Sequence, residues 1–352
     1  MDQSTYDPCL LQSNEPFGIV GLQTDDTLFL ADETFAEAEQ NELHKAKFVA
    51  KEREQLTVDT PLKFNGGLIQ LASDGTTITL TQERQFKNLS TISIKPATSS
   101  SSRGVTRTSL TPKDQYIAQR ARGAYIASVC QPEASFDLSF AAQVINPGKD
   151  DAKALNKRLD WQIKNPSRGL KFIELDVNTL QLLVFTDALF VNNKDLSSQI
   201  GYVIILADAT KKANIVHWSS VKCKRVTWSV LASELYGMAH GFDISAVIKS
   251  TVDKILQVNL PLILCTDSKS LYDCLVRLGT TQEKRLMVDV MCLRQAYERR
   301  QVTEVKWING ETNPADAMTK GKPCTALTQL IDTNRIELQA VEWVERMDSA
   351  RA

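Results

Sequence analysis

The chain has 352 residues, of which 43% are hydrophobic, so it is large enough for two packed domains. Its 41 basic and 42 acidic residues nearly cancel, which argues against a nucleic-acid binder that works by charge alone. A polar N-terminus, apolar runs too short for a membrane span and seven scattered cysteines predict a soluble intracellular protein, in the cytoplasm or the nucleus.

The first third of the chain shows uneven local charge. Between Asp25 and Glu42 there are seven acids and no Lys or Arg, which predicts a solvated helix over residues 32–48 whose apolar residues face a sheet. Residues 97–104 read as a Ser-rich linker. The basic stretch that follows has two interpretations, a solvated face or a set of phosphate contacts made by Arg103, Arg107 and Arg120.

Two helices are predicted next, over residues 115–130 and 150–165, the second ending at Pro166. In the first, Ile117, Ala124 and Ala127 recur at helical spacing, which is typical of residues that face a core.

The C-terminal half predicts a mixed sheet. Three apolar runs joined by short polar turns favour an antiparallel meander, with strands over residues 180–188, 200–208 and 213–220. Two further runs, 260–267 and 302–310, are separated by helical patterns and favour parallel strands with crossovers. The prediction is an α/β fold with a five-stranded mixed sheet and helices on both sides.

Four acidic residues occupy special positions in this pattern. Asp187 and Asp267 end apolar strands that are expected to be adjacent and parallel, Glu234 lies beside the apolar stripe of a helix, and Asp316 opens the last helix. A carboxylate at the end of a buried strand is costly unless something neutralises it, and a divalent cation does so directly. The alternatives are a surface acid for Glu234 and an ordinary helix-start acid for Asp316.

The motifs around these acids resemble a known family. The segments "FTDA", "CTDSKSLYDCL" and "NPADAMTKG" are similar to the ribonuclease H domain of LTR retrotransposon polyproteins, closest to the copia type, over residues 178–322. Residues 17–32 resemble the reverse-transcriptase palm of the same polyproteins, with Asp25 and Asp26 at a hairpin tip. The resemblance implies four parts: a truncated α+β palm fragment (1–96), a Ser-rich linker with a helical thumb or connection region (97–177), the ribonuclease H-like domain (178–322) and a helical tail (323–352).

The family's activity is hydrolysis of the RNA strand of RNA–DNA hybrids with two Mg²⁺ ions, for which Mn²⁺ is an alternative. The resemblance implies that Asp187 and Asp316 hold the ion that activates water, and that Asp187, Glu234 and Asp267 hold the ion at the leaving 3′ oxygen. Ser268 and Ser270 are candidates for contacts to 2′-hydroxyls, with helix capping as the alternative. The expected partners are an RNA–DNA hybrid and the remainder of a pol polyprotein.

The sequence departs from the family in two places. Many ribonucleases H carry a His in the loop before the last aspartate, whereas this loop reads "INGETNPAD", which predicts slower product release. Polymerases also need an aspartate from an earlier strand, and only 24 residues precede Asp25, so reverse-transcriptase activity is not expected. The alternatives to an active nuclease are a catalytically silent retroelement remnant, or a host-retained protein that binds nucleic acid or a partner. The four intact acids favour the nuclease.

Overall fold

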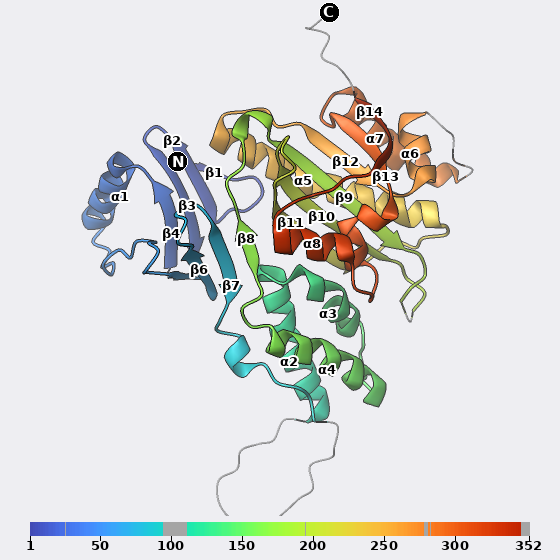
Figure 1. Cartoon of the computed structure of the whole chain (residues 1–352), viewed down its shortest axis with the longest axis horizontal. Helices are drawn as coiled ribbons and strands as arrows, with labels where there is room; N and C mark the ends of the chain where they lie inside the picture. Colours follow the sequence, from blue (N-terminus) through green and yellow to red (C-terminus); the bar gives the residue numbers. More distant parts are fainter. Residues whose placement is uncertain (25, 94–110, 194, 278–280, 282, 346–352) are drawn as a thin grey trace, which may run out of the picture.

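The computed structural model describes residues 1–24, 26–93, 111–193, 195–277, 281 and 283–345. Within these residues, two small antiparallel sheets lie at one end of the molecule, a large mixed sheet lies at the other, and a group of helices packs between and below them (Figure 1). No helix in the described part of the chain is both long and apolar enough to cross a lipid bilayer.

The N-terminal sheet is an antiparallel meander followed by a helix. Its strands are β1 (Asp2–Gln3), β2 (Leu10–Asn14), β3 (Phe17–Gln23) and β4 (Asp26–Ala31), and the helix is α1 (Glu33–Lys45). The Asp32 carboxylate caps α1 by accepting a hydrogen bond from the backbone N–H of Phe35 at 2.7 Å. Phe35 is buried as predicted, whereas Ala38 is exposed, because one aromatic side chain suffices to dock this charged helix.

The second sheet joins distant parts of the sequence. Its strands are β5 (Leu62–Phe64), β6 (Gly67–Leu71), β7 (Ile78–Gln82) and β8 (Leu170–Phe172), and a short 3₁₀ helix, η1 (Phe86–Asn88), follows β7. β8 pairs antiparallel with β7 directly after the helical region, so the chain returns to this sheet before it enters the large one.

The helical group has a core of its own. It comprises α2 (Pro112–Val129), η2 (Pro132–Ala134), α3 (Ser135–Ala142) and α4 (Lys149–Lys164). The core prediction for the first helix was right for Ala127, which is buried, and wrong for Ile117, which is 49% exposed. The buried stripe also includes Tyr116, Gly123 and Ile126. The centre of the buried face is offset from the predicted stripe, because Tyr116, Gly123 and Ile126 each lie one residue, about 100°, before a predicted position.

The large sheet has the predicted mixed topology. Its strand order is β11-β10-β9-β12-β13-β14, with β9 (Gln181–Leu189), β10 (Gln199–Ala207) and β11 (Ala213–Lys222) as the antiparallel meander. β12 (Leu262–Thr266) lies parallel to β9, and β13 (Glu304–Ile308) lies parallel to β12. The predicted mixed α/β sheet is therefore confirmed, but the predicted count of five strands is corrected to six.

The sixth strand, β14 (Ala340–Glu345), pairs antiparallel with β13. It falls in the segment 323–352 that the sequence predicted to be a helical tail. Its described part, residues 323–345, contains one helix, α8 (Thr325–Thr333), and then crosses to the free edge of β13. An unpaired edge strand offers backbone groups to any extended segment nearby, which is why residues 340–345 are recruited as a strand.

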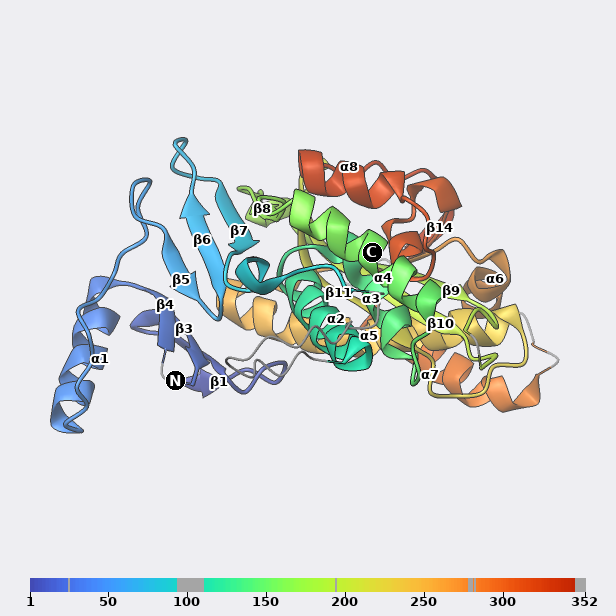
Figure 2. The same cartoon turned by 90° about the horizontal axis from the view of Figure 1, so that it is seen from below.

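Helices cover both faces of this sheet (Figure 2). One face packs against α5 (Val230–Leu256), α6 (Lys269–Val276), the short η4 (Lys284–Leu286) and α7 (Met287–Glu298), with β9 contributing Leu182 and Val184. The other face packs against η6 (Pro314–Met318) and α8, with β9 contributing Leu183 and Phe185. Two further 3₁₀ helices are η3 (Val177–Thr179) and η5 (Gly310–Thr312). Because side chains alternate along a strand, a strand buried on both faces is apolar throughout.

Candidate active site

Strand register brings Asp187 and Asp267 together. Thr186 on β9 lies opposite Thr266 on β12 in the parallel pair. Asp187 and Asp267 directly follow these two threonines. Both threonines are fully buried, and Asp187 itself is only 3% exposed. The Trp307 indole N–H donates to the Asp267 backbone carbonyl at 3.2 Å, which fixes the chain at the end of β12. The two carboxylates thus leave the middle of the sheet side by side.

Asp316 reaches the same place through a loop anchored by Asn313. The buried Asn313 amide donates to the Thr186 carbonyl at 3.1 Å, and its oxygen accepts from the Ala315 N–H at 3.1 Å. These bonds attach η6 to β9 one residue before Asp187. Asp316 therefore belongs to a 3₁₀ helix. The prediction that it is the first residue of the last helix was wrong.

Glu234 comes from the opposite face of the sheet, near the start of α5. A Cβ added at Gly237 would lie 3.3 Å from the Asp187 carbonyl oxygen, and one at Gly241 would lie 3.0 Å from the Thr186 side chain. Two glycines four residues apart thus allow α5 to approach β9 closely. Glu234, three residues before Gly237, is consequently buried beside the strand end, where it accepts a hydrogen bond from the Ala188 N–H.

Three of the four acids form a tight cluster. Carboxylate oxygens of Asp187, Asp267 and Asp316 all lie within 4.8 Å of one another. Glu234 lies outside that set of three but interacts electrostatically with Asp187 and Asp267. Burial, Asp187 and Asp267 raise the pKa of Glu234 to about 9, and burial, Asp187 and Asp316 raise the pKa of Asp267 to about 6. Burial and Asp187 also raise the pKa of Asp316.

Two residues that the sequence reading did not assign contact the cluster. The buried Thr319 hydroxyl donates to the Asp187 carboxylate, and the Lys320 ammonium lies 2.8 Å from Asp316 Oδ1 and 3.6 Å from Asp187 Oδ2. Burial alone would lower the pKa of Lys320, but Asp187 and Asp316 outweigh that effect and raise it. Both residues belong to the motif "NPADAMTKG", where Thr319 and Lys320 are the "TK", and this motif could have identified them.

The carboxylates fit a divalent cation by an independent criterion. Among the described residues, Glu234 Oε2 is buried with no hydrogen-bond partner. A buried, unpartnered carboxylate oxygen is expensive, and coordination to a metal removes that cost. Oxygen ligands from several carboxylates are the donors that Mg²⁺ and Mn²⁺ prefer.

The raised carboxyl pKa values predict how stability depends on pH. Glu234 and Asp267 have ordinary values of 4.5 and 3.8 and folded values of about 9 and about 6, so above their ordinary values the folded state holds more protons than the unfolded state. Raising the pH through these windows therefore destabilises the metal-free protein. The melting temperature in EDTA should fall as the pH rises from 5 to 9, and saturating Mg²⁺ should reduce the fall.

Glu234→Gln provides the control, because the amide does not titrate. This variant should lose the part of the slope that lies above about pH 6, where Glu234 is the group still titrating. A melting temperature in EDTA that stays constant or rises over this range would contradict the predicted burial of the carboxyl groups. Differential scanning fluorimetry at fixed ionic strength is sufficient for the measurement.

The remaining predicted site residues are not members of this cluster or lie outside the described residues. Ser268 caps α6, accepting from the Leu271 N–H at 3.4 Å, and its hydroxyl is 3.2 Å from that of the exposed Ser270. Asp26 is exposed and begins β4 opposite Gln23, as expected for a hairpin tip. Arg120 lies on α2, in the helical group. Asp25, Arg103 and Arg107 lie outside the described residues.

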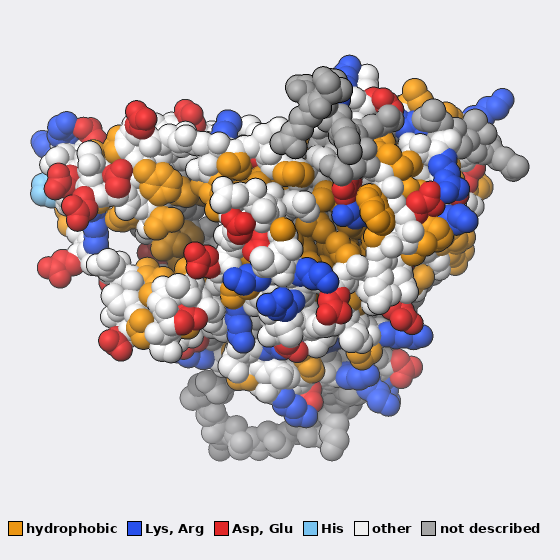
Figure 3. Space-filling model, turned by 45° about the horizontal axis from the view of Figure 1, so that its top comes forward, with side chains coloured by type: hydrophobic (Ala, Val, Ile, Leu, Met, Phe, Trp, Pro, Cys, Tyr) orange, Lys and Arg blue, Asp and Glu red, His pale blue; other side chains and the backbone are white. Residues whose placement is uncertain are grey.

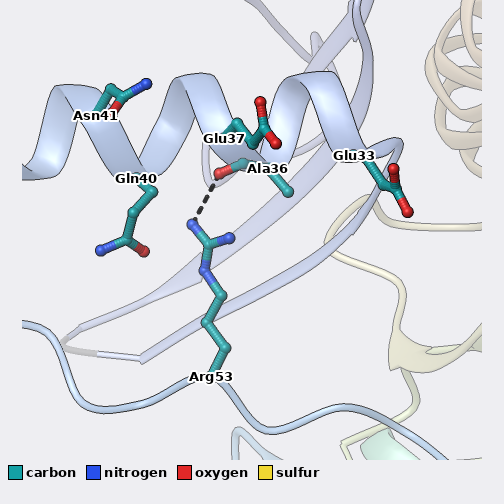
Figure 4. A pocket seen from close by; sticks show the side chains of 6 residues that line it. All are labelled: Glu33, Ala36, Glu37, Gln40, Asn41 and Arg53. Atoms are coloured by element: carbon teal, nitrogen blue, oxygen red, sulfur yellow. Dashed lines mark hydrogen bonds between the residues drawn. The ribbon is translucent and has the colours of Figure 1, made fainter.

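A separate hollow of about 550 Å³ lies beside α1, at the other end of the molecule from β9 (Figures 1 and 4). Arg53 crosses it and donates to the Ala36 carbonyl at 3.0 Å, which ties the segment after α1 back to the helix. Acidic side chains are numerous at this end of the space-filling surface, while Lys and Arg gather toward the middle of the same view (Figure 3). This hollow contains none of the clustered aspartates.

No protein-family model matches the sequence, and none of the curated proteins matches it. Among solved structures, the chain is similar to the N-terminal RNase H domain of Rv2228c from Mycobacterium tuberculosis, with 14% identity, a TM-score of 0.31 and coverage of 44% of this chain and 96% of that one. It is similar to LC11-RNase H1 from compost, solved in complex with an RNA/DNA hybrid, at 17% identity and a TM-score of 0.31, over 40% of this chain and 94% of that one. Prototype foamy virus protease-reverse transcriptase matches 88% of this chain and 43% of its own, at 7% identity and a TM-score of 0.24. Values this low assign no activity, so the function proposed below depends on the side chains of the site.

Proposed function

We propose that this protein hydrolyses the RNA strand of RNA–DNA hybrids with the help of divalent metal ions. The observation that carries the proposal is the convergence of Asp187, Asp267 and Asp316, with Glu234 beside them, at the end of the central strand. Carboxylates from four separate segments are the usual means of holding two ions for phosphodiester cleavage. The motif resemblance to ribonuclease H supports the hybrid as substrate.

The four acids have distinct proposed roles. Asp187 would be a ligand of both ions, Asp316 would complete one site, and Glu234 and Asp267 would complete the other. The metal ions, with Mg²⁺ preferred and Mn²⁺ as the alternative, supply an activated water and charge stabilisation at the leaving 3′ oxygen. The side chains keep their geometry through the contacts described above, in which Thr319 orients Asp187 and Asn313 places the loop of Asp316. Ser268 and Ser270, near Asp267 in sequence, remain candidates for contacts to 2′-hydroxyls.

The wider context is also part of the proposal. The motifs favour a copia-type retroelement, with residues 178–322 as the nuclease domain, residues 1–96 as a palm fragment, residues 97–177 as a connection and the rest of a pol polyprotein as partner. The β3–β4 hairpin that begins its second strand at Asp26 supports the palm interpretation. Reverse-transcriptase activity is not proposed for this chain.

A labelled hybrid tests the proposal directly. The purified chain should cleave the RNA strand of an RNA–DNA hybrid internally with Mg²⁺, and EDTA should stop the reaction. We expect cleavage at least about 100-fold slower for the same RNA in an RNA–RNA duplex and for the matching DNA–DNA duplex. The proposed selectivity requires one RNA strand and one DNA strand in the duplex. Equal cleavage of all three duplexes would indicate an unspecific nuclease, and an intact hybrid would favour the silent remnant.

A further inference from the structure

The ammonium group of Lys320 lies among the carboxylates proposed to hold metal. It is 2.8 Å from Asp316 Oδ1 and 3.6 Å from Asp187 Oδ2, and the proposed function assigns these two residues to the same ion. The ammonium therefore contacts ligand atoms of that ion. Two cations cannot both approach the same pair of oxygens closely, since like charges repel at short distance.

The Lys320 side chain can leave without moving the site. The side chain is 35% exposed, so part of it borders solvent. Its backbone is held, because the Lys320 N–H donates to the Asp316 carbonyl at 3.0 Å and the preceding Thr319 hydroxyl donates to Asp187. Rotation of the lysine side chain is thus sufficient to free the carboxylates, and the loop that carries Asp316 keeps its place.

We infer that Lys320 is a built-in counter-ion, whose ammonium neutralises Asp187 and Asp316 in the metal-free protein and gives up this position when a divalent cation binds. The inference rests on the proposed function, because it takes these two aspartates as metal ligands. The counter-ion has two opposite effects. It stabilises the metal-free fold, which otherwise holds crowded acids, and it weakens binding of the first divalent ion, because the ion must displace it.

Mn²⁺ binding to the full chain, without nucleic acid, tests the inference. Lys320→Met removes the charge and keeps much of the side-chain length. Its Mn²⁺ dissociation constant in isothermal titration calorimetry should fall on the order of fivefold, the effect of losing one half-exposed ion pair. Its melting temperature in EDTA should be lower than that of the wild type, and the rise caused by saturating Mn²⁺ should be larger.

Two control variants separate charge from general effects. Lys320→Arg keeps the charge and should bind Mn²⁺ within about twofold of the wild type. Lys249→Met removes a comparable (i, i+4) ion pair, with Asp253 on α5, and should leave Mn²⁺ affinity unchanged. Lys249 is 15 residues beyond Glu234 on the same helix, which is about 22 Å along its axis. If Lys320→Met does not fold by circular dichroism, Lys320→Gln serves in its place.

The outcomes distinguish this inference from the proposed function. Unchanged or weaker Mn²⁺ binding by Lys320→Met, with normal binding by the wild type, would overturn the inferred counter-ion role of Lys320. The nuclease proposal would remain intact. Failure of the wild type itself to bind Mn²⁺ would overturn both, because no ion would then compete with the lysine. Tighter binding by both Lys320→Met and Lys249→Met would also overturn it, since a general change of charge would explain the result.

Discussion

Asp187→Asn should reduce cleavage of hybrid RNA by more than about 100-fold, which corresponds to about 3 kcal/mol in the activation barrier. Asp187 is the most buried of the clustered aspartates and the residue proposed to contact both ions. The amide keeps the size of the carboxylate and an oxygen that can accept from Thr319, but it lacks the charge that binds metal. Cleavage of a labelled hybrid in Mg²⁺ measures the effect.

The folded state should tolerate this substitution. Asp187 raises the pKa of its acidic neighbours, so its removal relieves repulsion in the metal-free protein. The melting temperature in EDTA should therefore stay the same or rise, and the stabilisation by Mg²⁺ should largely disappear. Asp195→Asn is the matched control, because Asp195 is an exposed acid paired with Lys222, and it should retain activity. Equal cleavage by the wild type and Asp187→Asn would mean that this acid does not bridge the ions.

Gly201→Ala should have a large effect on stability and should also disturb the position of Asp316. Gly201 on β10 is the register partner of Asp187, and a Cβ there would lie 2.2 Å from Met318 Cβ and 3.2 Å from the Ser219 carbonyl oxygen. Neither neighbour is a flexible side-chain end, so the backbone must shift. Overpacking of this kind typically costs 1–3 kcal/mol, and we expect about 3 kcal/mol here.

The shift should displace η6, because Met318 ends that helix and Asp316 belongs to it. Cleavage by the folded fraction of Gly201→Ala should therefore fall about tenfold or more, as expected when a catalytic group is misplaced. Gly21→Ala is the control, since an added Cβ there meets only ordinary contacts of 3.7 Å or more. Urea denaturation and hybrid cleavage measure the two effects. Wild-type stability of Gly201→Ala would show that η6 does not pack on this strand.

The sequence predicted most of the large sheet because its strands are apolar on both faces and its turns are short. The same pattern placed Asp187 and Asp267 side by side. The prediction that Asp187 ends its strand was wrong, because β9 continues to Leu189, whereas Asp267 directly follows β12. Glu234 was found from the apolar stripe of its helix. The strand positions depend on local periodicity and on the geometry of parallel strands. The choice of these four acids as a set also depended on the motif resemblance to ribonuclease H.

Other features depend on tertiary contacts that no local pattern shows. Residues 340–345 form β14 because they pair with the edge of β13. The sequence analysis did not predict a strand in this segment. Gly201 and Gly237 are required by the close approach of η6 and α5, and an isolated glycine in a strand or helix does not reveal its neighbour. Lys320 looks like a surface lysine until the fold brings Asp187 beside it. The buried face of α2 was misplaced because its small residues give a weak stripe.

Strand β14 also affects how this chain resists association with other copies. Without it, the parallel strand β13 would present unpaired backbone groups, which invite pairing between molecules. The edge of β14 carries Glu342, paired with Arg277, and its backbone is fastened by the Tyr297 hydroxyl at the Val344 carbonyl. Charge on an edge strand discourages intermolecular pairing. A fragment cut at residue 322 would lose both this protection and α8, whose Leu327 and Leu330 are fully buried, so we expect residues 323–345 to fold together with the large sheet.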